Sequence, residues 1–198
     1  MLQALIIFVR NPELGKVKTR LAATMGDEKA LHIYRLLLQH TCAITRNQLA
    51  DKYVFYTSTP VVNDLWDQAG YFQLLQQEGG LGEKMQHAFE TLFARGYTKV
   101  IIIGSDCIDL TSAIINQAFE SLTTRDAVIG PANDGGYYLL GTKKVYAELF
   151  QNKEWSSAEV CNATLEDFKK LYLSFDVLPE LIDIDTEEDW QEAQQQVL

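Results

Sequence analysis

Cysteine and histidine are scarce in this chain, and long apolar runs are missing. The three cysteines are an odd number without metal-ligand spacing, so neither a disulfide framework nor a zinc site is predicted. The three histidines also lack the spacing of a ligand set. No stretch approaches the roughly 18 consecutive apolar residues of a membrane span, and no signal-peptide pattern opens the sequence. We therefore expect a cytoplasmic protein without a membrane partner.

Positive charge is also in short supply. Lysine and arginine number 17 against 27 acidic residues, which gives a formal net charge of -10. A broad nucleic-acid surface needs a basic face, so we expect no nucleic-acid partner. The 198 residues are 47% apolar, enough for the core of one ordinary domain, and we expect residues 1–198 to form that single domain.

Short apolar runs alternate with segments of helical periodicity. Residues 4–9 and 100–103 are continuous apolar runs, which is typical of parallel strands buried on both faces. Further strands are expected at 52–57, 72–75, 127–130, 137–141, 172–175 and 181–184, and helices at 27–49, 61–69, 82–95, 112–122, 143–150, 158–169 and from 186. This alternation predicts an α/β fold, with a doubly wound, mostly parallel central sheet and helices on both faces.

A basic segment follows the first expected strand. Residues 10–20 hold Arg10, Lys16, Lys18 and Arg20, four of the 17 basic residues of an acidic chain. Ligands of open α/β sheets bind beyond the carboxyl ends of the strands, which is where this segment begins. Gly15 would let the backbone approach an oxyanion while the cations neutralise phosphate. The alternative is an ordinary solvated charged loop.

Neither familiar phosphate loop is present in this segment. The sequence has no G-x-x-x-x-G-K-[ST] and no G-x-G-x-x-G, which disfavours a P-loop NTPase and a simple dinucleotide dehydrogenase. A flavodoxin-like or response-regulator domain would share the alternation of strands and helices. Such a domain would need acidic residues after the first strand, where this chain is basic.

Carboxylates are expected at the same edge of the sheet. Asp106 follows the apolar strand at 100–103, and Asp183 and Asp185 alternate with isoleucines, so both of their carboxylates would point one way. Magnesium typically takes one or two carboxylates together with substrate phosphates. The alternative for Asp185 is local, because Asp185 or Thr186 would also serve as the cap of the last helix.

Two glycine turns each allow a structural and a functional interpretation. The turn at 79–82 precedes a helix, so its amides would either meet a base or phosphate or simply start the helix. The turn at 133–136, which contains Asp134, is either a tight hairpin or part of a substrate site.

Five sequence blocks together resemble a known family. They are F-V-R-x-P-x-x-G-K-x-K-T-R-L at 8–21, G-G-L-G-E-K-M at 79–85, G-S-D-C-I-D-L at 104–110, G-P-A-N-D-G-G-Y-Y-L at 130–139 and D-I-D-T-E-E-D at 183–189. In these blocks the chain resembles a glycosyltransferase-like family of the nucleotide-diphospho-sugar transferase (GT-A) superfamily. That family is also called the radical-SAM/selenodomain-associated transferases and is related to the phospholactate guanylyltransferases. The chain departs from it at Ile108, where the family usually has proline.

The resemblance implies a role for each block. Asp106 takes the place of the GT-A metal-binding aspartate, with Asp183 and Asp185 as further ligands of Mg²⁺ or Mn²⁺. Asp134 would lie beside the acceptor as a substrate-binding or base residue, and Lys18 and Arg20 would act on the departing phosphates. The residues implied in nucleotide and phosphate binding are Arg10, Gly15, Lys16, Lys18, Thr19, Arg20, Gly80, Gly82 and Glu83.

Two reactions fit these residues. One is glycosyl transfer from a nucleotide sugar to a small acceptor, which the resemblance favours. The other is nucleotidyl transfer from an NTP to a small phosphorylated acceptor with release of pyrophosphate, which the density of cations favours. A hypothesis of another class is a non-catalytic nucleotide-binding module that regulates a partner.

Overall fold

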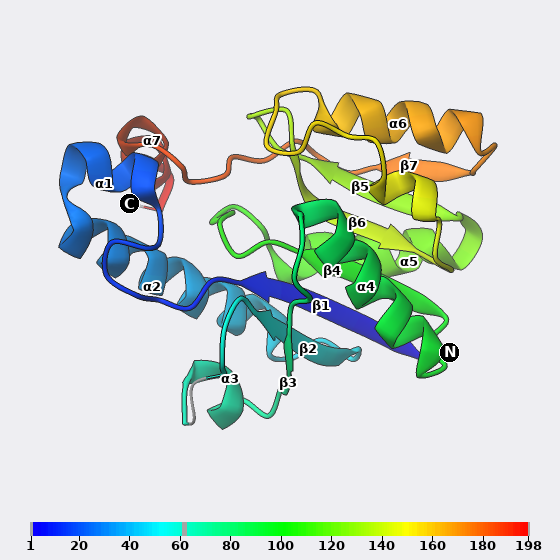
Figure 1. The fold of residues 1–198 in the computed structure, drawn as a ribbon, viewed down its shortest axis with the longest axis horizontal. Coiled ribbons are helices and arrows are strands. Elements are labelled where there is room, and N and C mark those ends of the chain that lie inside the picture. Colours follow the sequence, from blue (N-terminus) through cyan, green and yellow to red (C-terminus); the bar gives the residue numbers. More distant parts are fainter. Residues whose placement is uncertain (1, 61–62, 198) are drawn as a thin grey trace.

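Seven strands form one mixed sheet in the computed structural model, which describes residues 2–60 and 63–197 (Figure 1). Across the sheet the strand order is β3-β2-β1-β4-β6-β5-β7. The strands are β1 (Gln3–Val9), β2 (Asp51–Tyr56), β3 (Phe72–Leu75), β4 (Lys99–Ile103), β5 (Ala127–Pro131), β6 (Tyr137–Thr142) and β7 (Phe175–Val177). Within this sheet β6 runs against the other strands, so the predicted mostly parallel α/β fold is confirmed.

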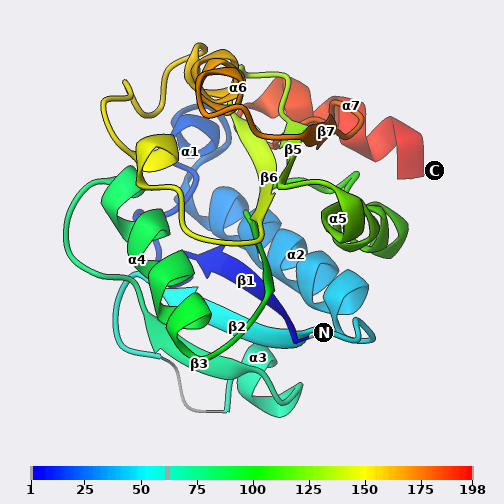
Figure 2. The same ribbon diagram turned by 90° about the vertical axis from the view of Figure 1, so that its right-hand side faces the viewer.

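Helices cover both faces of the sheet, as Figure 2 shows for α2 and α5 on one side and α4 on the other. The first face is covered by α2 (Asp27–Thr45), α3 (Leu65–Gln68) and α5 (Ser112–Thr124). The second face is covered by α4 (Leu81–Ala94), the 3₁₀ turn η1 (Ala147–Phe150) and α6 (Val160–Lys170). None of the described helices combines the length and the apolar character that a membrane crossing requires.

Alternation along β1 divides the core between these faces. Leu5 and Ile7 pack in the cluster under α2 and α5, and Ala4 and Ile6 pack in the cluster under α4. All four are fully buried, because a strand directs successive side chains to opposite faces and both faces are covered. Complete burial of a leucine or isoleucine side chain contributes about 1.5–3 kcal/mol, so this short run anchors both layers.

A third cluster lies beyond the carboxyl ends of the strands. It joins α1 (Thr19–Met25), the first half of α2 and α7 (Glu187–Val197) through Leu21, Ile33, Ile184 and Trp190. Ile184 comes from the segment that precedes α7. This packing brings the chain's last segment beside the segment that follows β1.

The order of the strands reverses beside β1. The chain passes from β1 outward through β2 and β3 and then returns to β4, which pairs with the other side of β1. Ligands of open α/β sheets bind at such a switch point, outside the carboxyl ends of the strands. Arg10 directly follows β1, and Asp106 lies in the segment after β4.

Several expected element boundaries were wrong. The helix expected at 143–150 is only η1, because Lys143 N donates to Asp126 O and the Thr142 hydroxyl donates to Lys144 O, which keeps this segment beside the sheet. The helix expected at 27–49 ends at Thr45, and that at 158–169 is Val160–Lys170. The helix expected at 61–69 is reduced to α3, started by the Asp64 cap, and positions 61 and 62 lie outside the described residues.

Two expected strands also differ, and one helix was not expected. The strand at 172–175 is displaced to Phe175–Val177, because Tyr172 takes a left-handed conformation (φ 54°) in the turn after α6. The segment 181–184 forms only isolated bridges, from Leu181 to Ala132 and from Asp183 to Cys107. The basic segment does not extend to Arg20 as a loop, since α1 begins at Thr19.

Candidate active site at the switch point

Backbone pairing brings the predicted carboxylates together. Cys107 and Asp183 form an antiparallel bridge, and Ile184 N donates to Asp106 O at 3.0 Å. Ile184 is fully buried while its neighbours Asp183 and Asp185 are partly exposed, so the alternation expected of a strand is present. The carboxyl group of Asp106 therefore lies at the same edge of the sheet as those of Asp183 and Asp185, which are more than 70 residues away in the sequence.

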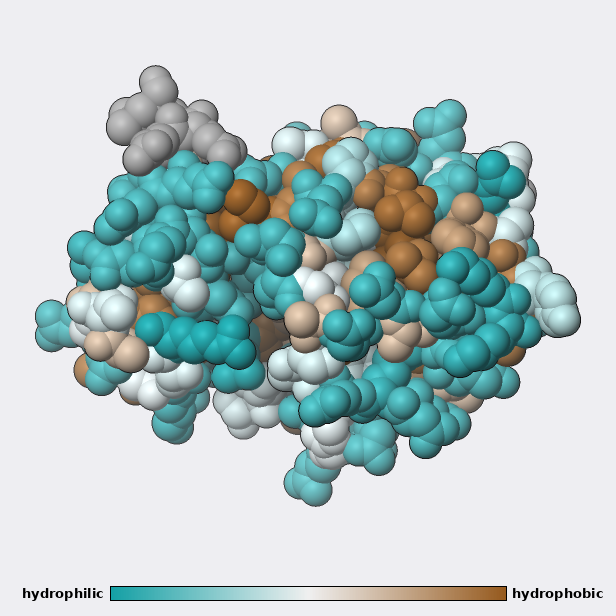
Figure 3. Space-filling view, turned by 90° about the horizontal axis from the view of Figure 1, so that it is seen from above, coloured by the Kyte–Doolittle hydropathy of each residue, from teal (hydrophilic) through white to brown (hydrophobic). Residues whose placement is uncertain are grey.

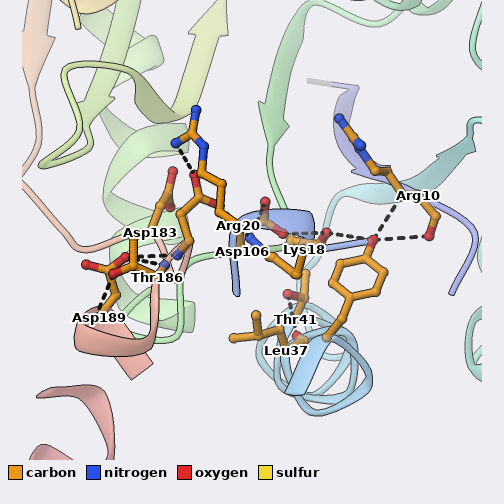
Figure 4. Close-up of polar contacts among 12 residues, drawn as sticks. Arg10, Lys18, Arg20, Leu37, Thr41, Asp106, Asp183, Thr186 and Asp189 are labelled. Atoms are coloured by element: carbon orange, nitrogen blue, oxygen red, sulfur yellow. Dashed lines mark hydrogen bonds and ion pairs between the residues drawn. The ribbon is translucent and has the colours of Figure 1, made fainter. Parts of the chain in front are cut away.

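Lys18 lies among these carboxylates. Its Nζ is 2.9 Å from Asp106 Oδ2 and 3.0 Å from Asp185 Oδ1, and only 5% of its side chain is exposed. Figure 4 shows Lys18 beside Asp106, between Asp183 on one side and Arg10 on the other. Burial alone would lower the pKa of Lys18, but the two carboxylates outweigh burial and hold this pKa above its ordinary value. Lys18 is therefore a fixed positive charge in the site.

The backbone at Lys18 explains this placement. Lys18 precedes α1 with φ 47° and ψ 48°, a left-handed conformation that costs a non-glycine residue about 1–2 kcal/mol. Gly15 supplies another positive φ, 74°, and Val17 is buried in the core between them. Strained backbone of this kind is often found at functional sites.

The other cations of the segment are more exposed. Arg20, 67% exposed, lies 3.4 Å from Asp185 Oδ2, and Lys16, 72% exposed, pairs with Glu13 at 2.6 Å. The Arg10 side chain is exposed at the end of β1, and Thr19 is exposed at the start of α1. The structure thus brings Lys18 and Arg20 to the carboxylates and leaves Lys16 on the surface.

Tyr34 of α2 links the two strand ends, and the sequence pattern did not single it out. Its hydroxyl accepts from Arg10 N (2.9 Å), donates to Arg10 O (3.1 Å) and lies 3.4 Å from Ser105 Oγ. Burial, with a further contribution from Asp106, raises the pKa of Tyr34 to about 12. A tyrosine at an apolar helix position carried no signal beyond packing.

Two amide side chains also connect the loops at this edge, and they were missed as well. Asn11 donates to Thr59 O at 3.0 Å and accepts from Ser58 N at 3.1 Å. Gln76 donates to Val9 O, at the last residue of β1, and to Phe55 O, at the next-to-last residue of β2. Both follow strands at their carboxyl ends, so the rule that located the carboxylates would have located them too.

Asp183 holds an unfavourable charge. Burial, followed by repulsion from Asp106, raises the pKa of its carboxyl group to about 7. Nearby Lys18 opposes this rise but does not cancel it. A nearby cation would relieve the same repulsion, which is a reason to treat Asp183 as part of the site rather than of the core.

The alternative role of Asp185 as a helix cap is resolved by the hydrogen bonds at α7. Thr186 Oγ1 accepts from Asp189 N at 3.3 Å, while Asp189 Oδ2 accepts from Thr186 N and Asp185 N. Thr186 and Asp189 therefore cap the helix through their side chains. The carboxylate of Asp185 remains with Lys18 and Arg20.

The donor set suits a divalent cation bound together with phosphate. Asp106 and Asp185 direct oxygens to one point, with Asp183 adjacent, and magnesium needs only one or two carboxylates when phosphates supply further ligands. In the described part of the chain no three histidine, cysteine or acidic side chains already form a metal-binding group. The residues therefore fit a metal that arrives with a phosphate ligand.

The turn before α4 performs a structural role. Gly80 N donates to Glu83 Oε2 at 2.8 Å, so Glu83 closes the first turn of the helix. Gly82 has no room for a side chain, since a Cβ there would lie 2.5 Å from Trp155 Nε1 and 2.3 Å from Phe150 O. A role of Gly80, Gly82 and Glu83 in nucleotide binding stays a prediction.

The turn between β5 and β6 is a tight one. Asp134 Oδ1 accepts from Gly136 N at 2.8 Å, and Gly135 has a positive φ of 85°. Gly135 lies against the segment before α6, where a Cβ would approach Ala158 O to 2.0 Å. Asp134 also contributes to the raised pKa of Asp183, which places its charge on the same side of the molecule.

The fold and this edge define a protein with the nucleotide-diphospho-sugar transferase fold. The family described as "Uncharacterized protein conserved in bacteria (DUF2064)" matches residues 38–157, and the chain belongs to this family. Among curated proteins, none matches this sequence.

Solved structures give the same fold. A provisionally assigned nucleotide-diphospho-sugar transferase from Desulfovibrio desulfuricans G20 is 33% identical, with a TM-score of 0.89 over 98% of this chain and 87% of its own. A cytidylyltransferase from Leptospira borgpetersenii is 13% identical, with a TM-score of 0.63 over 98% of this chain and 85% of its own. Glucosyl-3-phosphoglycerate synthase from Mycobacterium tuberculosis, in complex with Mn²⁺, UDP and glucosyl-3-phosphoglycerate, is 13% identical, with a TM-score of 0.56 over 98% and 76%.

Proposed function

We propose that this protein is a metal-dependent transferase that moves a sugar from a nucleotide sugar to a small acceptor. The observation that carries the proposal is the buried Lys18 between Asp106 and Asp185 at the switch point, with Arg20 beside it. Support comes from the 33% identical relative assigned as a nucleotide-diphospho-sugar transferase and from the Mn²⁺ and UDP of the glucosyl-3-phosphoglycerate synthase complex. We further propose that residues 1–198 act as one domain, whose partners are the donor and the acceptor rather than nucleic acid or a membrane.

In this proposal the charges at the edge divide the work. Asp106 and Asp185, with Asp183, would hold Mg²⁺ or Mn²⁺, which when bound supplies positive charge to the donor's phosphates. Lys18 and Arg20 would bind the departing diphosphate and stabilise the negative charge that develops on it. Asp134 would contact the acceptor hydroxyl from the turn between β5 and β6. In this proposal the metal-binding carboxylates and the two cations act by positioning and charge rather than by forming a covalent intermediate.

The exposed cations favour a second candidate reaction. Arg10, Lys16 and Arg20 are exposed in the same segment as the buried Lys18, which gives this segment a high density of positive charge. A triphosphate would use it, as in nucleotidyl transfer to a small phosphorylated acceptor. The resemblance to phospholactate guanylyltransferases and the fold shared with a cytidylyltransferase support this candidate.

The experiment that separates these reactions is an assay of the released product. Purified protein is incubated with a panel of nucleotide sugars and NTPs, with small-molecule cell extract as acceptor, in Mn²⁺ or in EDTA. Release of a nucleoside diphosphate, read by mass spectrometry, supports glycosyl transfer, and release of pyrophosphate supports nucleotidyl transfer. Donor binding without turnover in any arm would favour a non-catalytic module.

Asp106→Asn tests the metal assignment. It removes a charge that pairs with Lys18, and we expect turnover to fall by about 100-fold or more, as for loss of an electrostatic contact in a transition state. Asp109→Asn makes the same chemical change three residues further along and serves as the control, because Asp109 takes part in none of the ion pairs of the described residues. Undiminished turnover in Asp106→Asn would refute the assignment.

A further inference from the structure

Lys18 occupies the point at which a metal ion would be bound. Its Nζ lies within 3.0 Å of one oxygen each of Asp106 and Asp185, so both carboxylates are directed to a single position. A divalent ion bound by the same two oxygens would lie close to that position, since metal–oxygen distances are shorter still. The ammonium group and the ion would also repel each other. Lys18 and a metal therefore exclude each other on these carboxylates.

The placement of Lys18 is built into the fold. The left-handed backbone at Lys18 and the buried Val17 before it hold the side chain inside the site. The neighbouring Lys16 is different, because its side chain is exposed and pairs only with Glu13 among the described residues. An ordinary surface lysine would show the environment of Lys16.

We infer that Lys18 acts as an internal counter-cation. Its ammonium group prevents a divalent metal from binding Asp106 and Asp185 until the phosphates of a donor bind and pair with the lysine instead. The inference rests on the proposed function for the identity of the donor. Metal alone would have to displace a buried ammonium group and leave it without a partner, which is unfavourable. Donor phosphates offer the displaced lysine a new anionic partner, so metal and donor bind cooperatively. The site would then assemble only around a complete metal–donor complex.

The first test measures Mn²⁺ binding without nucleotide, from the spin-resonance signal of free Mn²⁺. Three proteins are compared: wild type, Lys18→Met and the matched control Lys16→Met, which removes one positive charge from the same segment. If Lys18 leaves the carboxylates about a tenth of the time or less, Lys18→Met binds Mn²⁺ about tenfold or more tightly than wild type. Lys16→Met stays within about twofold of wild type, because an exposed charge is largely screened. Equal or weaker binding by a folded Lys18→Met overturns the inference.

A second measurement covers the case in which Lys18→Met does not fold. Wild-type protein is treated with an acetylating reagent, and the modification of Lys18 and Lys16 is followed by mass spectrometry. Lys18 is protected in metal-free protein, and saturating Mn²⁺ alone is expected to increase its rate of modification several-fold while Lys16 is unaffected. An unchanged rate at Lys18 under saturating Mn²⁺ overturns the inference.

Adding UDP, GDP or GTP to the Mn²⁺ titration distinguishes this inference from the proposed function. We expect a nucleotide to tighten Mn²⁺ binding more in wild type than in Lys18→Met. Equal tightening in both proteins, with equal affinity for Mn²⁺ alone, overturns the role of Lys18 and leaves the proposed function standing. Absence of Mn²⁺ binding in every arm overturns both.

Discussion

Asp183 carries the least favourable charge at the edge of the sheet, and this predicts a measurable dependence on pH. Although Asp183 is partly exposed, loss of hydration of its carboxyl group, followed by repulsion from Asp106, raises the pKa of this group to about 7 from its ordinary value of 3.8. Between these values the folded state retains a proton that the unfolded state has lost, so stability falls as the pH rises from 4 to 7. Asp183→Asn removes this loss. In EDTA we expect the variant to be more stable than wild type by about 2–4 kcal/mol above pH 7.

The measurement is urea unfolding of both proteins from pH 4 to pH 8. The advantage of Asp183→Asn should shrink to below about 1 kcal/mol near pH 4, where the folded wild-type carboxyl group is protonated and the unfolded one is close to half protonated. A constant difference across this range would contradict the prediction. A carboxyl group with an ordinary pKa would give no such trend.

Gly135 is predicted to be irreplaceable because of its neighbour. Its positive φ of 85° strains any side chain, and a Cβ would also approach Ala158 O to 2.0 Å. Gly96 has a similar φ of 90°, but a Cβ there meets nothing within 4 Å. We expect Gly135→Ala to destabilise the protein by about 1–3 kcal/mol more than Gly96→Ala, the difference being the overpacking. Equal losses in chemical denaturation would show that backbone strain alone decides.

Single residues differed in how well the sequence located them. Asp106 was predicted at this edge because it follows a continuous apolar run typical of a parallel strand, and the carboxyl ends of parallel strands lie at one edge of the sheet. The ion pair between Lys18 and Asp185 was not predictable, because it joins positions 167 residues apart. For Glu83 the position was predictable but the role was not, since a glutamate that caps a helix and one that contacts a nucleotide look the same in a sequence.

At the scale of elements, the segment 151–159 depends on one buried ion pair. Lys153, whose side chain is 2% exposed, pairs with Asp167 of α6, and Trp155 of the same segment packs on Gly82 of α4. Lys153→Met leaves Asp167 with the exposed Lys170 as its one remaining ion-pair partner among the described residues. Removal of one partner from a buried pair is strongly unfavourable, and we expect a loss of about 2–3 kcal/mol in the free energy of unfolding.

Lys169→Met is the matched control for this element. Lys169 pairs with Glu166 on the surface of α6, and both side chains are more than half exposed. Such a pair contributes little, so the change should stay within about 0.5 kcal/mol in urea unfolding. Similar losses for the two variants would mean that segment 151–159 does not depend on Lys153.

Elements were predictable to different degrees, for physical reasons. The strands β1 and β4 were found because burial on both faces leaves a continuous apolar run. The short helix α1 was not expected, since it begins inside the basic segment and buries only Leu21. Residues 143–146 have no helix because the end of β6 holds them by hydrogen bonds that no local pattern reports.

At the scale of the whole molecule, the site is produced by topology. The alternation of strands and helices predicted an open sheet, but not that β1 lies between β2 and β4. That order depends on long-range pairing, which composition and periodicity do not encode.

The surface seen in Figure 3 is mostly hydrophilic with separate apolar patches. On a chain with a net charge of -10, the cations of residues 10–20, directly after β1, are a local excess of positive charge.

Binding of metal and donor together should stabilise the whole chain, because it would join segments after β1 and β4 to the segment before α7. A ligand at 100 times its dissociation constant stabilises a protein by about 2.7 kcal/mol. For a chain of this size that corresponds to a rise in Tm of about 5–10 °C. We expect this rise in calorimetry with Mn²⁺ and a bound nucleotide such as UDP or GTP, and a much smaller one with Mn²⁺ alone, since Lys18 holds Asp106 and Asp185.

Asp106→Asn should lose most of the rise in Tm, whereas Lys169→Met, which changes an exposed side chain of α6, should retain it. An equal rise with the nucleotide in EDTA would show that the phosphates are held by the cations without a metal.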